Sequence, residues 1–237
     1  MIVFWRLFLA LFLTDLIIFN RTLSKMQQTS HSRAMLVRAT TFSVLALLFC
    51  WRYLSMGWPF LEEVTLPGWM CIILFALFHG FTDYYLRFGG KCKYGYTLTF
   101  LVKNFVNILF LVLISPFDVL YETGNFFAES WVVFLVGVML SVRGLGWLIT
   151  ALEQDKYGPD YPSFDAQWLM ALVRSIFFLI MLLPGIRWAV VFVVWMSTCL
   201  YARRIRLLDV PLWAFFLGSL GACFIGFLVR LRFYLVS

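Results

Sequence analysis

Several apolar segments of the chain contain side chains that could do acid–base or ion-binding chemistry. His79 and Asp83 lie four residues apart in "LFHGFTDYYLRF" (77–88), a spacing that places both on one face of a helix. A carboxylate beside an imidazole can tune its protonation, as a proton path requires. The rest of this polar cluster is Asp15, Arg38, Lys103, Asn104 and Asn107.

Ionisable groups in membrane-spanning segments are costly and normally face the bundle interior or a watery cavity. We therefore predict that the polar cluster converges, so that Asp15 and Asp83 compensate Arg38 and Lys103. Three roles fit such a cluster: a path for an ion or ligand, catalysis, or a structural clamp that fixes helix register. Arg38 and Asp83 could instead extend to nearby lipid head groups.

Arg143 and Arg174 form a second set, near the middle of two expected spans that contain no acidic residue. An unpaired arginine at that depth is expensive. Its partners could be Asp15 or Asp83, the carbonyl groups near Gly144 and Gly146, or the phosphate of an anionic lipid.

Composition indicates an all-α, multi-pass membrane protein. Of the 237 residues, 63% are hydrophobic and 13% charged, and the mean hydropathy is +0.90. Soluble domains have roughly 25% charged residues. The net charge of +7 therefore points to membrane orientation and contact with anionic lipids, not to nucleic acid. The five cysteines show no CxxC spacing, so we expect no disulfide, no metal site and no cofactor.

Hydropathy predicts about eight membrane-spanning helices, with six or seven as alternatives, each near the roughly 20 residues that cross a bilayer. We expect one transmembrane domain over residues 1–237, with possible halves 1–116 and 130–237, and no soluble domain. The connection from 152 to 165 is expected to be polar. The expected spans are 2–19, 36–54, 67–86, 97–115, 130–151, 166–184, 187–202 and 211–229.

The distribution of Lys and Arg predicts the orientation. The connections that would share one side hold eleven of these residues, and the opposite connections with the C-terminal tail hold four. The richer side is expected to be cytoplasmic. The polar cluster would then lie in the cytoplasmic half of a bacterial-type inner (plasma) membrane. The four connections on the richer side are 20–40, 84–96, 152–165 and 203–209.

Small residues recur on two expected helices. Gly218, Ala222 and Gly226 are spaced every four residues, and Gly137 and Ser141 form a shorter version. Such stripes let a second helix backbone approach closely. They predict either packing within the chain or an oligomer face.

The first half of the chain resembles a family of uncharacterised bacterial inner-membrane proteins, a domain of unknown function with His-x-x-x-Asp elements in its helices. The resemblance covers roughly residues 5–113 and implies that the polar positions belong together. "LALFLTDLI" has Leu11 where histidine is expected, and "FHGFTDYYLRF" keeps His79 and Asp83. "FLVKNFVNI" has Lys103 and Asn104 in place of the usual pair.

The sequence contains no Walker motif, no GxSxG and no HExxH. We therefore expect a non-enzymatic subunit of a membrane complex, channel-like, transport-related or an effector. It would associate with lipids and with copies of itself or other subunits. One alternative is a lipid-processing or lipid-carrying enzyme, with Arg143 and Arg174 on phosphate and His79 with Asp83 as acid and base. Another is a structural scaffold.

Overall fold

A computed structural model describes most of the chain, and it divides into two compact units, Met1–Val136 and Gly137–Ser237. Each unit is described by itself. The structure describes residues 2–18, 31–61, 64–88, 95–116, 129–158, 164–208 and 210–235.

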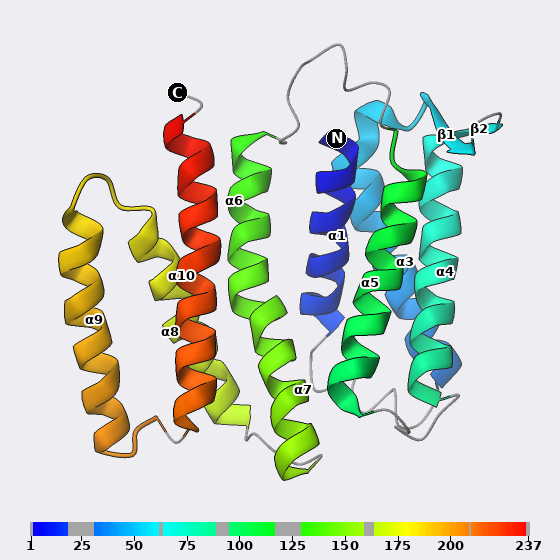
Figure 1. Cartoon of the computed structure of the whole chain (residues 1–237). Coiled ribbons are helices and arrows are strands. Elements are labelled where there is room, and N and C mark those ends of the chain that lie inside the picture. Colours follow the sequence, from blue (N-terminus) through cyan, green and yellow to red (C-terminus); the bar gives the residue numbers. More distant parts are fainter. Residues whose placement is uncertain are drawn as a thin grey trace. The chain divides into compact units, whose positions relative to one another are not determined.

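In the described part of the first unit, four helices pack in a closed order. These are α1 (Ile2–Ile18), α3 (His31–Cys50), α4 (Gly68–Phe88) and α5 (Tyr96–Ile114) (Figure 1). Helix α1 packs on α3, α3 on α4, α4 on α5, and α5 again on α1. Every helix therefore has a face toward a common interior. Phe42, Phe75 and Leu111 are fully buried there.

A β-hairpin connects α3 to α4, where the sequence predicts no strand. After the 3-10 turn η1 (Trp51–Tyr53), strands β1 (Gly57–Leu61) and β2 (Val64–Pro67) pair antiparallel. Trp58 is fully buried, and its Nε1 donates a hydrogen bond to the Tyr53 carbonyl at 3.0 Å. A Cβ atom on Gly68 would lie 2.6 Å from the Trp58 ring. The hairpin thus forms because a bare backbone at the start of α4 leaves room for the indole.

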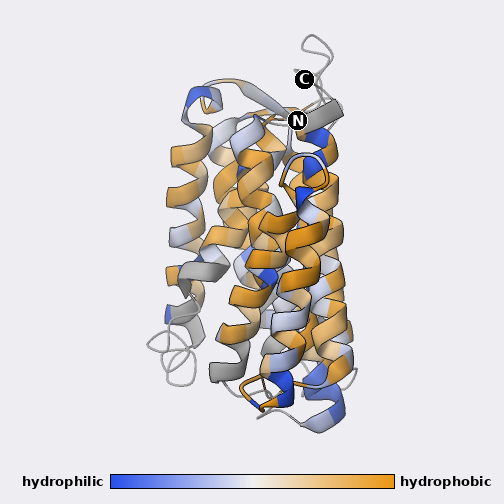
Figure 2. Cartoon of the chain, turned by 90° about the vertical axis from the view of Figure 1, so that its left-hand side faces the viewer, coloured by the Kyte–Doolittle hydropathy of each residue, from blue (hydrophilic) through white to orange (hydrophobic). Residues whose placement is uncertain are grey.

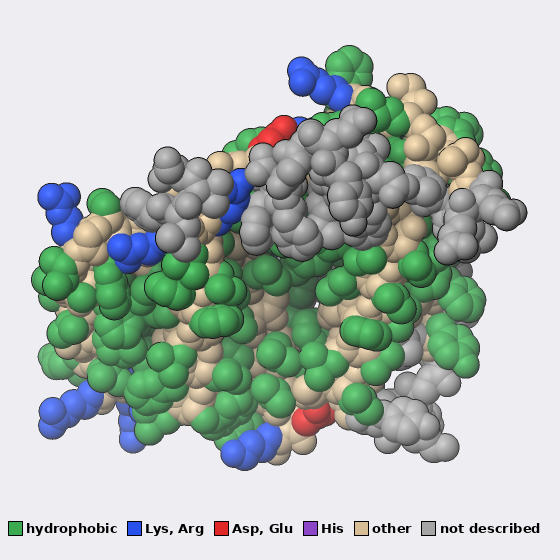
Figure 3. All heavy atoms as spheres, turned by 45° about the horizontal axis from the view of Figure 1, so that its top comes forward, with side chains coloured by type: hydrophobic (Ala, Val, Ile, Leu, Met, Phe, Trp, Pro, Cys, Tyr) green, Lys and Arg blue, Asp and Glu red, His purple; other side chains and the backbone are tan. Residues whose placement is uncertain are grey.

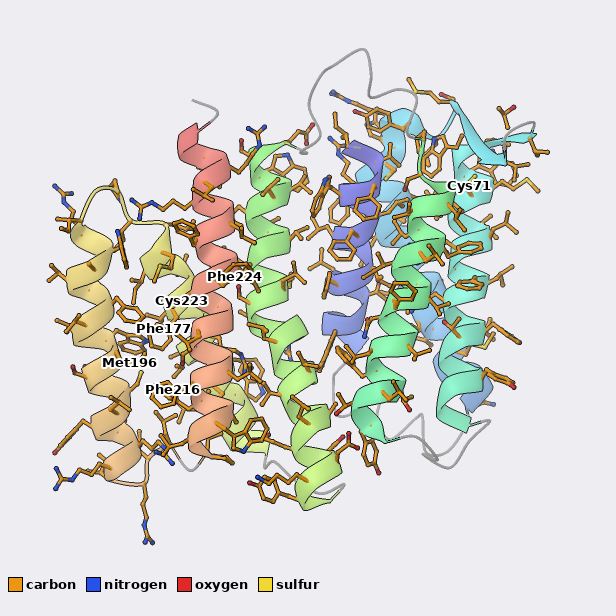
Figure 4. The ribbon with its side chains drawn as sticks, viewed as in Figure 1. Cys71, Phe177, Met196, Phe216, Cys223 and Phe224 are labelled. Carbon is orange, nitrogen blue, oxygen red and sulfur yellow. The ribbon has the colours of Figure 1, made fainter. Side chains whose placement is uncertain are left out.

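The second unit is built around the pair α8 (Phe164–Met181) and α10 (Leu212–Leu235). Helix α9 (Arg187–Arg204) packs on α8, and α7 (Leu145–Tyr157) packs on both members of the pair. The core contains Phe177, Met196 and Cys223 (Figure 4).

One long helical run, from 130 to 157, contains a wider turn. Helix α6 (Ser130–Met139) continues through the π-helical segment η3 (Leu140–Gly144) into α7, and the Leu145 amide donates to the Leu140 carbonyl. Single π-turns inside α-helices are often found at functional sites. The sequence analysis ends this helix at 151, whereas the structure continues it to Tyr157. Residues 152–157 are therefore helical and not part of a connection.

Two tight turns close α8 and α9. Gly185, with φ 62°, lies between α8 and α9, which form a hairpin. After α9, Arg206 has φ 59°, while the Leu207 amide donates to the Ala202 carbonyl at 2.9 Å and the Arg206 amide to Arg203 at 3.0 Å. This is a Schellman ending with arginine where glycine is usual.

Large apolar side chains cover the outer faces of the helices. Phe105 of α5 is 68% exposed and Val190 of α9 is 63% exposed. Apolar residues dominate the helices and hydrophilic residues gather near their ends (Figure 2), and hydrophobic side chains cover the flanks in Figure 3. Soluble proteins rarely expose such continuous apolar surface.

Among the residues that the structure describes, four helices are suited by length and composition to cross a membrane: Met35–Tyr53, Tyr96–Ile114, Ser130–Tyr157 and Leu212–Phe233. Shorter apolar helices cover Ile2–Thr14, Gly68–Thr82 and Trp168–Met181. The predicted all-α class is confirmed, and each of the expected spans coincides with a helix of the structure. The number that cross a membrane stays a prediction.

The close approach of α8 to α10 predicts that an alanine at Gly226 of α10 destabilises the protein more than an alanine at Gly221 of the same helix. A Cβ at Gly226 would lie 2.7 Å from the Phe178 carbonyl oxygen, whereas a Cβ at Gly221 would meet only the methyl groups of Leu145. The main chain at Phe178 cannot move away from an added methyl group, whereas the end of the Leu145 side chain can rotate away. Gly226→Ala should lower the free energy of unfolding by about 1–3 kcal/mol.

Gly221→Ala is the matched control, because both substitutions gain the same roughly 1 kcal/mol of helix propensity. Cys50, Cys71, Cys199 and Cys223 are free and buried, so a thiol-reactive dye can follow thermal unfolding. Equal melting temperatures for the two variants would contradict the close contact at Gly226.

Candidate functional site

All four helices of the first unit contribute a buried polar side chain. Asn107 and Thr14 are 1% and 0% exposed, and Arg38, His79 and Thr82 are also buried. On α5 the arrangement is inverted relative to a soluble helix, since Leu101, Phe105 and Leu109 are exposed while Asn107 is buried. The buried polar set is Thr14 (α1), Arg38 (α3), His79 and Thr82 (α4) and Asn107 (α5).

Two contacts between α3 and α4 place Arg38 at the level of His79 on the neighbouring helix. Met35 and Phe42 flank Arg38 by about one turn on each side of the same α3 face. A Cβ at Gly80 would lie 3.1 Å from Met35 Cγ, and the Phe42 and His79 rings are 6.4 Å apart. Arg38 is buried and lies on the α3 face that packs on α4 near His79.

A short hydrogen-bonded link joins α4 to α5. The Thr82 hydroxyl lies 2.9 Å from the His79 carbonyl oxygen and 3.1 Å from Asn107 Oδ1. The hydroxyl has one proton, so it donates to one of these oxygens at a time. The His79 ring stacks on Phe75, with centroids 6.0 Å apart and planes 5° apart. His79 is therefore held between aromatic rings in a fully buried position.

Three residues of the predicted polar cluster are buried in the first unit, and the convergence of the whole cluster stays a prediction. The described residues bring Arg38, His79 and Asn107 into one interior. Lys103 and Asn104 are half-buried, and Asn104 Nδ2 donates to the Phe100 carbonyl of its own helix at 2.8 Å. The side chains of Asp15 and Asp83 lie outside the described part of the structure, so their contribution stays a prediction.

The sequence analysis missed Thr14 and Thr82, although a signal was present. Each threonine directly precedes one of the two aspartates, in "TD" pairs at 14–15 and 82–83. Thr14 Oγ1 donates to the Ala10 carbonyl at 2.8 Å. A hydroxyl that can bond its own helix is inexpensive to bury, which is why hydropathy alone does not reveal such positions.

Arg6 is a second residue that the sequence analysis missed. Its Nη2 donates to both carboxylate oxygens of Glu129, at 2.7 and 2.8 Å, and its Nη1 donates to the Phe49 carbonyl at 2.7 Å. The guanidinium also lies over the rings of Tyr53 and Trp131. Arg6 therefore ties α1 to the end of α3 and to the residue that precedes α6.

This ion pair predicts a measurable coupling. Arg6→Gln should destabilise the protein by about 2 kcal/mol because it removes charge-assisted hydrogen bonds from a largely buried donor. In a double-mutant cycle with Glu129→Gln, the two effects should couple by about 1 kcal/mol.

Arg52→Gln is the control, since Arg52 is an exposed arginine in the adjacent turn η1. Thermal unfolding of the four proteins measures the coupling. Strictly additive effects of Arg6→Gln and Glu129→Gln would show that the pair contributes nothing.

In the second unit the two arginines that the sequence analysis paired have different contacts. Arg174 of α8 is 4% exposed, and its Nη2 donates to the Val142 carbonyl of the π-helical segment at 3.2 Å. Arg143 is half-buried, and its guanidinium lies 5.7 Å from the ring centre of the exposed Trp168. Of the proposed partners of Arg174, the structure thus shows a main-chain carbonyl near Gly144.

Glu153 is the unexpected member of this region. The sequence analysis placed it at the start of a polar connection, but it lies in α7 and is 1% exposed. It interacts electrostatically with Arg174. The available signal was its spacing: Glu153 follows the apolar Ile149 by four residues and so shares its face.

The small-residue stripe receives side chains of its own unit. Gly218 lies against Ile149 and Arg174, and Gly226 against Phe178 and Met181. Ala222 is fully buried. A Cβ at Gly137 would meet Val229 and Phe178, and the Ser141 hydroxyl donates to the Gly137 carbonyl at 2.8 Å. These contacts are within the chain.

No group of three or more His, Cys, Asp or Glu side chains in the described ranges is placed to hold a metal ion. Comparison of the chain with protein-family models, with curated proteins and with solved structures finds no match.

Proposed function

We propose that the chain is an integral membrane protein of a bacterial-type inner membrane, crossing it six to eight times, whose first unit provides a path for a proton or small ion. In this role it is a non-enzymatic, channel-like or transport-related subunit. The observation that supports the proposal is the set of buried polar side chains on α1, α3, α4 and α5 around one interior.

The chemistry of that interior suits a small charged species. It contains a cation at Arg38, an imidazole at His79, and the hydroxyl–amide link of Thr82 and Asn107. An imidazole can both give and accept a proton. The path proposed from the sequence adds Asp15, Asp83 and Lys103 toward one end of the same helices.

The lipid-processing alternative receives less support. It requires Arg143 and Arg174 to grip one phosphate group, and Arg174 is buried beside an acidic residue. A carboxylate near the binding arginine repels a phosphate. The scaffold alternative differs in its prediction, because its polar residues would affect folding and nothing else.

Ion flux into liposomes that contain the purified protein tests the proposal. His79→Leu and Asp83→Asn should each reduce proton flux by about tenfold or more, since a positioned proton acceptor contributes on the order of a hundredfold to a transfer step. A pH-sensitive dye inside the liposomes measures the rate.

Thr40→Val is the matched control, because the Thr40 hydroxyl is exposed on α3 and bonds only the Leu36 carbonyl. It should leave the flux unchanged. Equal flux for wild type and both path variants would contradict the proposal. Loss of flux only in proportion to loss of folded protein would favour the scaffold.

A further inference from the structure

We propose that Glu153, Arg174 and Ser219 form a proton-binding site inside the second unit, where the Glu153 carboxylate takes up a proton from hydronium and leaves water. The reverse step returns the proton to water, so that mass and charge balance. This inference concerns a different unit from the proposed ion path and does not depend on it.

Glu153 is the residue that gains and loses the proton. It is 1% exposed, and its Oε1 has no hydrogen-bond partner among the described residues. An isolated buried carboxylate is so costly that it must be neutralised or compensated. Acidic residues in this position within membrane helices mark proton relays.

Arg174 compensates Glu153 without locking it in a salt bridge. The two side chains interact electrostatically, but within the described part of the chain they form no direct ion pair. Arg174 makes one hydrogen bond, to Val142, and its buried Nε has no acceptor among the described atoms. Because no direct ion pair among the described side chains holds the carboxylate, it can take up a proton without breaking a hydrogen bond to Arg174.

Ser219 of α10 supplies the third polar group. Ser141, Ser175 and Ser197 each donate to the carbonyl four residues earlier. By contrast, the Ser219 hydroxyl is fully buried and bonds no described group. Its hydroxyl can donate to a carboxylate or to water and can accept from a guanidinium.

Glycine contacts bring the three helices together at this point. Gly218 directly precedes Ser219, and a Cβ there would lie 3.4 Å from Arg174 Cδ and 3.1 Å from Ile149 Cδ1. Ile149 is one turn before Glu153 on α7. The three polar groups thus come from α7, α8 and α10, which pack on one another. Water is the small molecule that could join a carboxylate, a guanidinium and a hydroxyl.

The elements that pack around Glu153 carry few other charged side chains. The π-helical segment contributes Arg143, which acts electrostatically on Arg174. Helix α8 contributes Arg174 itself, and α10 has no charged residue from Leu212 to Val229, its one thiol there being Cys223. On α7, Asp155, Lys156 and Tyr157 are exposed. Glu153 is therefore the only carboxylate among these residues that is buried.

Infrared difference spectroscopy of the full-length protein in lipid nanodiscs tests the site. Spectra at acid pH minus spectra at alkaline pH should contain a carbonyl band of a protonated carboxyl group buried in the protein. Glu153→Gln should abolish this band, and Asp155→Asn, which changes an exposed carboxylate two residues along the same helix, should retain it. A band of unchanged intensity in folded Glu153→Gln would overturn the proposal.

Two further variants keep the test decisive. Ser219→Ala should shift the band, because it removes the hydroxyl that water would join to the carboxyl group, an effect that a purely structural role would not produce. If Glu153→Gln does not fold, Glu153→Asp keeps the carboxyl and should move the band. A band at the same position in wild type, Glu153→Asp and Ser219→Ala would contradict the assignment.

Discussion

The structure depends on one constraint: a polar side chain on an apolar helix must find its partner inside the protein. Without water at the outer face, an unsatisfied polar group costs several kcal/mol. Helix α5 shows the consequence within a single element, since its exposed face is Leu101, Phe105 and Leu109 while Asn107 points inward to Thr82. The inward position of Asn107 follows from this requirement, as does the bond between α4 and α5.

The two units meet the constraint in different ways. In the first, Arg6 donates two hydrogen bonds from Nη2 to Glu129 and a third from Nη1 to a main-chain carbonyl, and only its buried Nε has no acceptor among the described residues. In the second, Arg174 has only the Val142 carbonyl, which the π-helical turn presents, and Glu153 has no direct partner among the described residues. A directly paired charge stabilises a joint between helices. A buried carboxylate without a direct partner in the described ranges, such as Glu153, retains the capacity to exchange a proton.

Sequence reasoning found the helices and part of the polar interior, for a physical reason. Long apolar runs such as 97–115 leave few alternatives to a helix, and the cost of burial made His79 and Asn107 conspicuous. The packing of Trp58 depends on its close approach to Gly68, and the burial of Glu153 on the electrostatic interaction with Arg174 of another helix, and neither can be seen in a hydropathy pattern. A hydropathy profile ends the span before Glu153, because the profile contains no information about a compensating charge on another helix.

Accessibility of spin labels along α5 tests the central claim most directly. Single labels at positions 101, 105 and 109, in protein reconstituted in lipid, should be reached by oxygen dissolved in the bilayer and shielded from a water-soluble paramagnetic complex. Labels at positions 107 and 111 should be immobile and shielded from both, since Asn107 and Leu111 are buried. Labels at 101, 105 and 109 that are reached by the water-soluble complex would contradict a membrane-facing apolar surface around a polar interior.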